Sequence, residues 1–342
     1  MKKSKKLKRI ILIILVILLI GGISYAASTF LLNATQVSYD KSGTTMQVKE
    51  ALDDLYEKAL KPKVGDIVNY NANASDAAGT AFGTAYTYTT SNSGANGTNQ
   101  NTGDSTKSTF SSADDMVWKI LYIDKDAGVI RLMAANGTPQ KLTLKGAAGY
   151  AYSVNILDAA SQVYGNGYGA SSARSVRVED INQVTGFDPV SKGYGLHTQN
   201  YTSGSYFVDL VYASENNGQV TSYNRGAYGT YGKVTADSYY NYTGTTYLAN
   251  TTNSYKMIFQ NTSGSNRSYW LASRCVYFYS SYCAFRVRYV RYGGVRDSYL
   301  CYSDNSNEYD ISLAVCPVVS LNSNIQLSYV STSDGISTWN IQ

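Results

Sequence analysis

Short apolar runs bounded by turn-forming residues predict β-strands on both sides of a polar tract in the main body of the chain. Residues 64–70 (VGDIVNY) and 116–124 (MVWKILYID) are two such runs. Residues 125–128 (KDAG) are typical of a turn and lead into a third run, residues 129–135 (VIRLMAA). The second and third runs are therefore predicted to pair as a β-hairpin.

Helical spacing of apolar residues follows in two segments. One face of residues 153–164 (SVNILDAASQVY) carries Val154, Leu157, Ala160 or Ser161, and Tyr164. Residues 172–186 (SARSVRVEDINQVTG) begin with small polar residues and end at a glycine, which predicts a second helix.

An earlier amphipathic run lies at residues 44–60 (TTMQVKEALDDLYEKAL). Its apolar positions at helical spacing are Val48, Leu52, Leu55 and Ala59, and charged residues lie between them. The run ends before Pro62, so a helix of about four turns is expected. Two roles remain open for it: a stalk or oligomerising helix, or a helix that packs on its own domain.

The rest of the chain is irregular or β. Residues 71–112 consist almost wholly of Ala, Gly, Ser, Thr, Asn and Asp, which predicts a long surface insertion or flexible loop. Residues 187–264 are rich in Tyr, Gly, Ser and Thr and predict short strands at best. Strand patterns return at residues 268–273 and 314–322, so residues 64–342 are predicted to form one α+β domain with long irregular loops.

The N-terminus is typical of a targeting segment. A basic stretch precedes the apolar run at residues 10–20, and Ser24 and Ala26 offer a small-x-small cleavage site. The apolar length favours a retained signal anchor at residues 1–27 with its basic end cytoplasmic, and a cleaved signal peptide is the alternative. We therefore expect a stalk at residues 28–63 and a C-terminal domain displayed at the cell surface, or secreted if the signal is cleaved.

Charge argues against a nucleic-acid partner. The net charge is +5, but six of the 29 basic residues lie within the first nine positions. Without them the exported part is close to neutral and lacks the basic excess that nucleic-acid binding needs.

Neither the cysteines nor the histidine forms a pattern of a known catalytic or metal site. Cys275, Cys283, Cys301 and Cys316 match no zinc spacing, and export permits a disulfide without requiring one. His197, which is the single histidine, has no nucleophile or carboxylate pattern around it. Residues 304–310 (DNSNEYD) space oxygen atoms as calcium loops do but lack the central glycine, so a solvated loop is expected. No catalytic residue, metal or cofactor is predicted.

Residues 275–307 have an unusual composition. They contain seven Tyr, four Arg and three Cys, but no Lys, Glu, Gln, Met or Trp. Apolar residues recur through this stretch and are expected to anchor it to the core, while the Tyr and Arg residues between them point outward, with Tyr277 and Tyr299 also candidates for the core. Tyr and Arg are enriched at binding hot spots, so the stretch predicts a binding surface.

The segments SYWLASR, FRVRYVRYGGVR and SLAVCPVVSLN together resemble bacterial domains with a C-type lectin-like fold of the formylglycine-generating-enzyme (sulfatase-modifying) variant. The resemblance covers about residues 64–324 and implies that fold here, preceded by the membrane helix and the short amphipathic helix. Cys316 departs from it, because an Arg is usual before the proline. The motif that surrounds the catalytic cysteines of those enzymes is absent around Cys275 and Cys283, so an enzyme is not expected.

A more specific resemblance is to the variable proteins of diversity-generating retroelements. In that family a reverse transcriptase copies a template repeat with errors at adenines, and Asn codons then yield Tyr, Ser, Asp, Arg, Gly, Cys and others. Such codons never yield Lys, Glu, Gln, Met or Trp, all of which are absent from residues 275–307. The stretch FRVRYVRYGGVR corresponds to FNVRNVNNGNVN before mutation. The resemblance implies fixed positions at Val276, Ala284, Phe285, Val287, Val290, Gly293, Val295 and Leu300.

Together these observations predict a surface-displayed protein that binds an unidentified protein or glycan on another cell, host or phage through a diversified region at about residues 275–310. The alternatives are an adhesin or glycan-binding lectin of fixed specificity and, less favoured, an enzyme of the formylglycine-generating type. The predicted ligand-binding residues are Tyr277, Tyr279, Tyr282, Arg286, Tyr289, Arg291, Tyr292, Arg296, Asp297, Ser298, Tyr299, Tyr302, Asp304, Asn305 and Asn307. Their predicted scaffold is Trp270, Phe285, Val287, Val290, Val295 and Leu300.

Overall fold

The computed structural model comprises two compact units, Met1–Lys61 and Pro62–Gln342, which are described separately. It describes residues 61–72, 116–124, 126–138, 141–188, 191, 234–238, 252–279, 282–302 and 309–342, together with the backbone of six further strands. The predicted signal anchor, His197, and Asp304, Asn305 and Asn307 lie outside the described residues.

The N-terminal unit contains an antiparallel pair of strands, β1 (Ser38–Lys41) and β2 (Thr44–Gln47). The predicted helix at residues 44–60 is therefore wrong for its first four residues, where backbone pairing with β1 replaces helical hydrogen bonds. Residues 48–60 lie outside the described part.

A seven-stranded sheet forms one side of the C-terminal unit. Its order is β18 (Leu327–Ser333), β19 (Ile336–Ile341), β3 (Ile67–Asn69), β6 (Trp118–Asp124), β7 (Val129–Ala134), β17 (Pro317–Leu321) and β9 (Ala170–Ser175). β6 and β7 pair antiparallel from Trp118↔Ala134 to Asp124↔Val129, which confirms the predicted hairpin.

A five-stranded sheet carries the Tyr-rich stretch. Its order is β15 (Gly294–Tyr302), β14 (Cys283–Arg291), β13 (Tyr269–Phe278), β16 (Asp310–Ala314) and β8 (Lys141–Lys145). β13, β14 and β15 are consecutive antiparallel strands, whereas β13 and β16 run parallel. β15 is thus the last strand on its side of the sheet.

Smaller sheets lie within the segments that were expected to be mostly irregular. β10 (Asn200–Ser203), β11 (Tyr206–Tyr212) and β12 (Val234–Ala236) form one of them. β4 (Tyr88–Thr90) and β5 (Asn99–Asn101) form another inside residues 71–112, so of the two expectations for this tract the flexible loop is wrong at these two strands.

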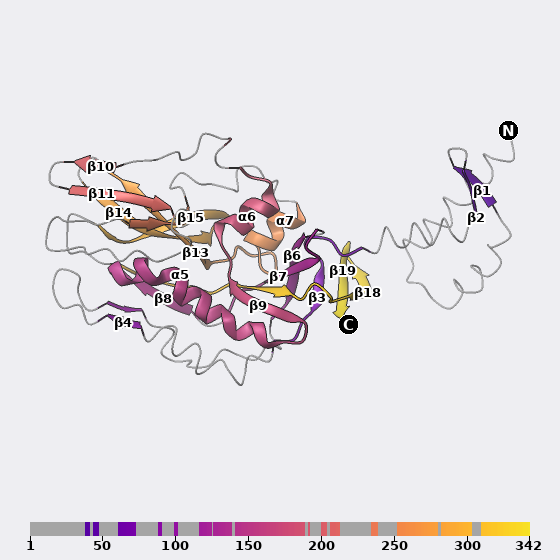
Figure 1. Ribbon diagram of the computed structural model, residues 1–342. Coiled ribbons are helices and arrows are strands. Elements are labelled where there is room, and N and C mark those ends of the chain that lie inside the picture. Colours follow the sequence, from indigo (N-terminus) through magenta and orange to yellow (C-terminus); the bar gives the residue numbers. More distant parts are fainter. Residues whose placement is uncertain are drawn as a thin grey trace. The chain divides into compact units, whose positions relative to one another are not determined.

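Helix α5 (Gly146–Gln162) continues into a short 3-10 helix, η2 (Val163–Asn166), and confirms the first predicted helix. It packs against β9 of the larger sheet and against β13 and β15 of the smaller one, and it can be followed along β8 and β9 in Figure 1. A single helix thereby covers strands of both sheets.

The second predicted helix begins later than expected. α6 covers Val178–Thr185 and ends at Gly186 in the left-handed conformation (φ 66°), but residues 172–175 belong to β9. Pairing of β9 with β17 explains the difference, since long-range strand pairing overrides local preference. A third helix, α7 (Asn253–Phe259), was not expected. It begins after Thr252, whose hydroxyl accepts a hydrogen bond from Tyr255 N at 3.1 Å.

The fold is thus mixed α+β, mostly β-sheet with few helices. Its core contains large side chains from both sheets, from α5 and from η2, among them Trp118, Trp270, Tyr150, Tyr164 and Phe285. Among the helices of the described residues, none has the length and apolar character that crossing a membrane requires.

Candidate ligand-binding surface

The apolar positions of β13, β14 and β15 face the interior. The predicted scaffold residues are all buried, with 0% exposure at Trp270, Phe285, Val287, Val290 and Leu300 and 4% at Val295. Val276 and Ala284, two further positions that the retroelement resemblance implies to be fixed, are 3% and 0% exposed. These side chains attach the stretch to the rest of the domain.

The predicted ligand-binding residues do not form one surface. Arg286 pairs with Tyr299 across β14 and β15, and Tyr289 pairs with Arg296 in the same uninterrupted register. Directly opposite residues share a face, and residues three apart on a strand face opposite sides of the sheet. Arg286 and Tyr299 therefore lie on one face of the hairpin, and Tyr289 and Arg296 lie on the other.

The first surface is a group of neighbouring aromatic rings, here named the tyrosine cluster. Its ring centroids are 4.3 Å apart for Tyr277 and Tyr279, 4.3 Å for Tyr279 and Tyr282, and 5.1 Å for Tyr282 and Tyr302. Tyr299 stacks on Tyr302 at 5.3 Å, and Tyr309 contacts both. The cluster is therefore Tyr277, Tyr279, Tyr282, Tyr299, Tyr302 and Tyr309.

A β-bulge brings Tyr302 into this cluster. Phe285 pairs with Cys301 but Arg286 pairs with Tyr299, so Leu300 is an extra residue on β15. In a regular strand Tyr299 and Tyr302 would face opposite sides, and the extra residue restores them to the same side. Burial, followed by the neighbouring Tyr299, raises the pKa of Tyr302 to about 12, so its hydroxyl stays protonated at neutral pH.

Arg286 lies in the middle of the tyrosine cluster. Its guanidinium carbon is 5.0 Å from the ring centroid of Tyr277 and 5.7 Å from that of Tyr299, and its Nη2 donates to the Tyr279 hydroxyl at 2.8 Å. Its Nη1 forms an ion pair with Asp297. Burial lowers the pKa of Arg286, but Asp297 more than offsets this and leaves it raised, so the side chain remains charged.

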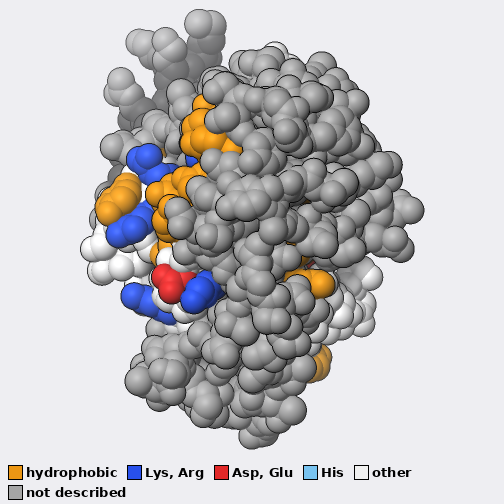
Figure 2. All heavy atoms as spheres, turned by 90° about the vertical axis from the view of Figure 1, so that its left-hand side faces the viewer, with side chains coloured by type: hydrophobic (Ala, Val, Ile, Leu, Met, Phe, Trp, Pro, Cys, Tyr) orange, Lys and Arg blue, Asp and Glu red, His pale blue; other side chains and the backbone are white. Residues whose placement is uncertain are grey.

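The second surface, here named the hairpin tip, comprises Tyr289, Arg291, Tyr292 and Arg296. Tyr292 is 64% exposed, and its ring centroid is 4.6 Å from the guanidinium carbon of Arg291 and 6.0 Å from that of Arg296. Tyr289 contacts buried Trp270 edge to face at 6.2 Å. Figure 2, which views the left-hand end of Figure 1, shows basic side chains lying among hydrophobic ones, a class that there includes tyrosine.

The turn at the hairpin tip has an unusual residue for its conformation. Tyr292 and Gly293 both have positive φ, 54° and 69°, as the two-residue type I′ turn requires. The hairpin of β18 and β19 makes the same kind of turn with Asp334 (φ 51°) and Gly335 (φ 75°). Asn and Asp are favoured at the first of these positions, whereas an aromatic residue is strained there.

We expect Tyr292→Asn to raise the free energy of unfolding by about 1 kcal/mol, because asparagine adopts positive φ more readily than tyrosine. Urea unfolding of the full-length chain measures this. Asp334→Tyr is the matched control, since it introduces the same strain in the other hairpin and should lower stability by a similar amount. A destabilised Tyr292→Asn would mean that the contacts of the ring with Arg291 and Arg296 outweigh the strain.

Two predicted ligand-binding residues have structural surroundings. Ser298 is 7% exposed, so the expectation of an outward position is wrong there: it pairs with Val287, which is itself fully buried. Asp297 is 22% exposed and accepts at 3.1 Å from Nη1 of Arg288, which is itself 1% exposed. Asp297 therefore joins a buried cation to the tyrosine cluster.

Sequence analysis also missed two contributors. Tyr309 belongs to the tyrosine cluster because its backbone N donates to Leu300 O at 2.9 Å, a contact that composition does not reveal. Arg288 was assigned as an unmutated residue and left out of the site, and its burial between Asp297 and Ser238 gives it a structural role. Because Arg288 lies in the sequence among arginines that point outward, the pattern of residue types did not indicate that Arg288 is buried.

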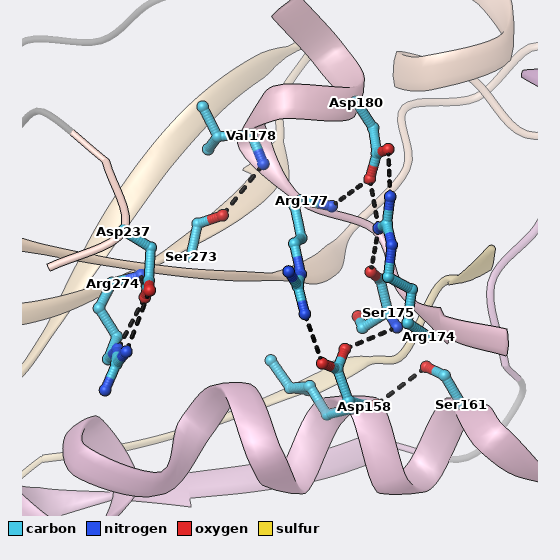
Figure 3. Close-up of polar contacts among 11 residues, drawn as sticks. Asp158, Ser161, Arg174, Ser175, Arg177, Val178, Asp180, Asp237, Ser273 and Arg274 are labelled. Atoms are coloured by element: carbon cyan, nitrogen blue, oxygen red, sulfur yellow. Dashed lines mark hydrogen bonds and ion pairs between the residues drawn. The ribbon is translucent and has the colours of Figure 1, made fainter. Parts of the chain in front are cut away.

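A polar network behind the hairpin holds β13 against α5 and α6 (Figure 3). Arg274 of β13 binds both carboxylate oxygens of Asp237, with Nε to Oδ2 at 2.7 Å and Nη2 to Oδ1 at 3.0 Å. Ser273 accepts at 3.0 Å from Val178 N at the start of α6. Arg177 and Arg174 bind Asp158 of α5 and Asp180 of α6, respectively. The strand that leads into the candidate surface is thereby fixed on both sides.

The four cysteines are buried, and none of them forms a disulfide. Burial raises the pKa of the Cys275 thiol to about 12, and burial likewise raises that of Cys316, whose sulfur lies 3.1 Å from Nη2 of Arg267. A buried, protonated thiol is a poor nucleophile. Groups of three or more metal-ligating side chains do not occur among the described residues.

Cys275 also predicts a pH dependence of stability. The unfolded chain releases this proton near the ordinary thiol pKa of about 8.5, so the contribution is intact below that pH and is lost as the pH rises toward the folded value, by up to about 1.4 kcal/mol per pH unit. We expect urea unfolding under reducing conditions to show this loss between pH 8 and 10. Cys275→Ala should show a smaller loss, and an equal loss in both proteins would contradict the assignment.

No known protein family, curated protein or solved structure matches this chain.

Proposed function

We propose that the protein is a surface-displayed ligand-binding protein whose binding residues are diversified by adenine-directed retroelement mutagenesis. In this proposal the α+β domain is a C-type lectin-like scaffold of the formylglycine-generating-enzyme variant without catalytic activity, and the N-terminal segment attaches it to the membrane. The ligand is a protein or glycan on another cell, host or phage.

The observation that carries the proposal is the separation of two classes of position. Seven of the eight positions implied to be fixed, among them Phe285, Val287 and Leu300, are buried, and the eighth, Gly293, lies in the hairpin turn. The predicted ligand-binding residues, which Asn codons can yield, are at least partly exposed wherever they are described, apart from Ser298. Cys275, Cys283 and Cys301, which such codons can also yield, are buried. A mutagenic process confined to the second class would change the surface and spare the core, whose substitution is the main source of large destabilisation.

The turn at Tyr292 and Gly293 adds independent support. The inferred unmutated sequence at these positions is Asn-Gly, which is the preferred pair for a type I′ turn. Selection for stability alone would not place tyrosine at a φ of 54°. Replacement of an ancestral asparagine by copying errors accounts for a strained residue at an otherwise ideal turn.

Sequencing the DNA that flanks the gene tests the proposal. A near-copy of the segment encoding residues 275–307 should lie close to a reverse-transcriptase gene. The near-copy and the segment should differ almost only at positions where the near-copy has adenine. A complete genome without such a repeat would overturn the proposal. If related strains also carried the same residues at Tyr289, Arg291 and Tyr292, a fixed-specificity adhesin or lectin would replace it.

A further inference from the structure

The hairpin tip carries positive charge that the described residues do not neutralise. Asp297 directs its carboxylate to the other face of the hairpin, where it pairs with two further arginines. Within the described part of the chain, Arg291 and Arg296 contact the ring of Tyr292 and form no ion pair. Both side chains are exposed, so two guanidinium groups are available to a ligand.

Both charges are absent from the inferred unmutated sequence FNVRNVNNGNVN, which has asparagine at positions 291 and 296. Arg286 likewise replaces an asparagine of that sequence, but it has an internal partner in Asp297. Under the proposed function, a copy of the gene that is retained with two uncompensated arginines on one face is expected to have a ligand of the opposite charge.

Strand register sets the spacing of the two arginines. Arg291 pairs with Gly294, and Arg296 lies two residues further along β15 and on the same face. Diagonal neighbours of this kind lie about 7 to 8 Å apart. Alternate residues of an extended polypeptide also point to one side, at a spacing of about 6.5 to 7 Å. Acidic residues at alternate positions of such a segment would therefore present one carboxylate to each guanidinium.

We propose that the hairpin tip binds an extended segment of a protein ligand that has acidic residues at alternate positions, with one carboxylate at Arg291 and the next at Arg296. This inference rests on the proposed function and gives the ligand a chemical class. Guanidinium groups bind carboxylates in a bidentate manner. The contacts use side chains of the hairpin only.

Two features favour a protein over an acidic glycan as the ligand. The spacing of the arginines matches the repeat of an extended polypeptide. Tyr292, which is 64% exposed and contacts both guanidinium groups, adds an aromatic ring to them, and this combination of tyrosine and arginine is typical of hot spots in protein–protein interfaces.

The test uses the full-length chain and a fluorescein-labelled ten-residue threonine peptide with four glutamates at alternate positions, with binding followed by fluorescence anisotropy. We expect saturable binding that weakens at high salt, because exposed charges are screened. Arg291→Ser with Arg296→Ser should weaken binding by about tenfold or more. Lys63→Ser with Lys141→Ser is the matched control, since it removes the same charge from exposed positions outside the hairpin and should leave binding unchanged. Thermal unfolding establishes that both double variants are folded.

Charge reversal distinguishes ligand contact from a structural role of the arginines. Arg291→Asp with Arg296→Asp introduces a residue that Asn codons can also yield. This variant should lose the glutamate peptide and bind the corresponding lysine peptide, which the unmodified chain should not bind. Failure of this exchange in a folded variant would contradict direct contact.

Two further probes test the spacing and the class of ligand. A ten-residue peptide with four glutamates at every third position has the same charge, but its successive carboxylates face opposite sides when it is extended, so it should bind more weakly. Equal binding of the two glutamate peptides, no binding of either, an equal loss in the lysine control, or tighter arginine-dependent binding of an oligogalacturonate, which carries its carboxylates on a glycan, would each overturn the inference. Because the DNA test does not depend on these results, failure here with the repeat present leaves the proposed function standing.

Discussion

Asp297→Ser is expected to lower the free energy of unfolding by about 3 kcal/mol, because it removes a carboxylate from a buried guanidinium. Arg288 is 1% exposed, and its Nη1 donates to Asp297 at 3.1 Å. Arg286 binds the same carboxylate, but it is 16% exposed and lies among tyrosine rings. Most of the loss should therefore arise at Arg288. Urea unfolding of the full-length chain measures it.

Asp310→Ser is the matched control for this prediction. Asp310 is an exposed strand aspartate on β16 of the same sheet, so its replacement should change stability by less than about 0.5 kcal/mol. The double variant Arg288→Met, Asp297→Ser should recover part of the loss, since it removes the uncompensated charge. Equal stability of Asp297→Ser and the unmodified chain would contradict the structural role of Asp297.

Under the proposed function, this role limits what diversification would achieve at one position. Asp297 is reachable from an Asn codon and was predicted to contact ligand, yet its carboxylate also serves a buried arginine. The proposed copying process would mutate this position like its neighbours, so copies of the gene with Ser, Tyr or Gly there should yield less stable proteins. Among functional copies of the gene, we expect aspartate to be retained at position 297 more often than arginine is retained at the exposed positions 291 and 296.

Asp237→Asn is the second substitution with a large expected effect, again a loss of about 3 kcal/mol. Asp237 accepts three hydrogen bonds from Arg274, two from the guanidinium and one from the backbone N at 2.8 Å (Figure 3). Asparagine keeps the size of the side chain but removes the charge, and its NH₂ group cannot accept from the guanidinium. Arg274 is 2% exposed, so water cannot replace the lost acceptor.

Asp126→Asn provides the control for Asp237, because Asp126 lies exposed in the turn between β6 and β7 and should tolerate the change. A double-mutant cycle of Asp237→Asn with Arg274→Met measures the coupling between the two side chains, which we expect to exceed about 1 kcal/mol. A coupling near zero would show that the pair does not hold β13 in place.

Two separate surfaces on one hairpin have a consequence for binding. The tyrosine cluster presents aromatic rings around a charge-compensated arginine, whereas the hairpin tip presents arginines without a described carboxylate partner. The first is suited to broad contacts with low rotamer cost, and the second to charged groups.

The sequence predicted the hairpin of β6 and β7 and the helix α5 because their signals are local: a turn between apolar runs and a helical spacing of apolar residues. The strand β9 and the helix α7 were missed for the opposite reason. β9 is polar and exists by pairing with β17, and α7 is a short helix of seven residues in a Tyr-rich segment, where periodicity is weak. The Thr252 cap before Met257, Ile258 and Phe259 was the one signal that could have indicated it.

The Asp-Gly pair at residues 334–335 could likewise have indicated the hairpin of β18 and β19.

For the candidate surface, the sequence by itself determined which positions are apolar and which are polar, and hence that Phe285, Val287 and Val290 are buried while Arg291, Tyr292 and Arg296 are exposed. Only the tertiary structure decided how the polar positions are distributed. Strand register places Arg286 and Arg296 on opposite faces, the extra residue Leu300 moves Tyr302 beside Tyr299, and Asp297 meets buried Arg288 across the hairpin. Register, bulges and ion pairs join residues from different strands, and composition and codon pattern, which describe residues one at a time, do not contain that information.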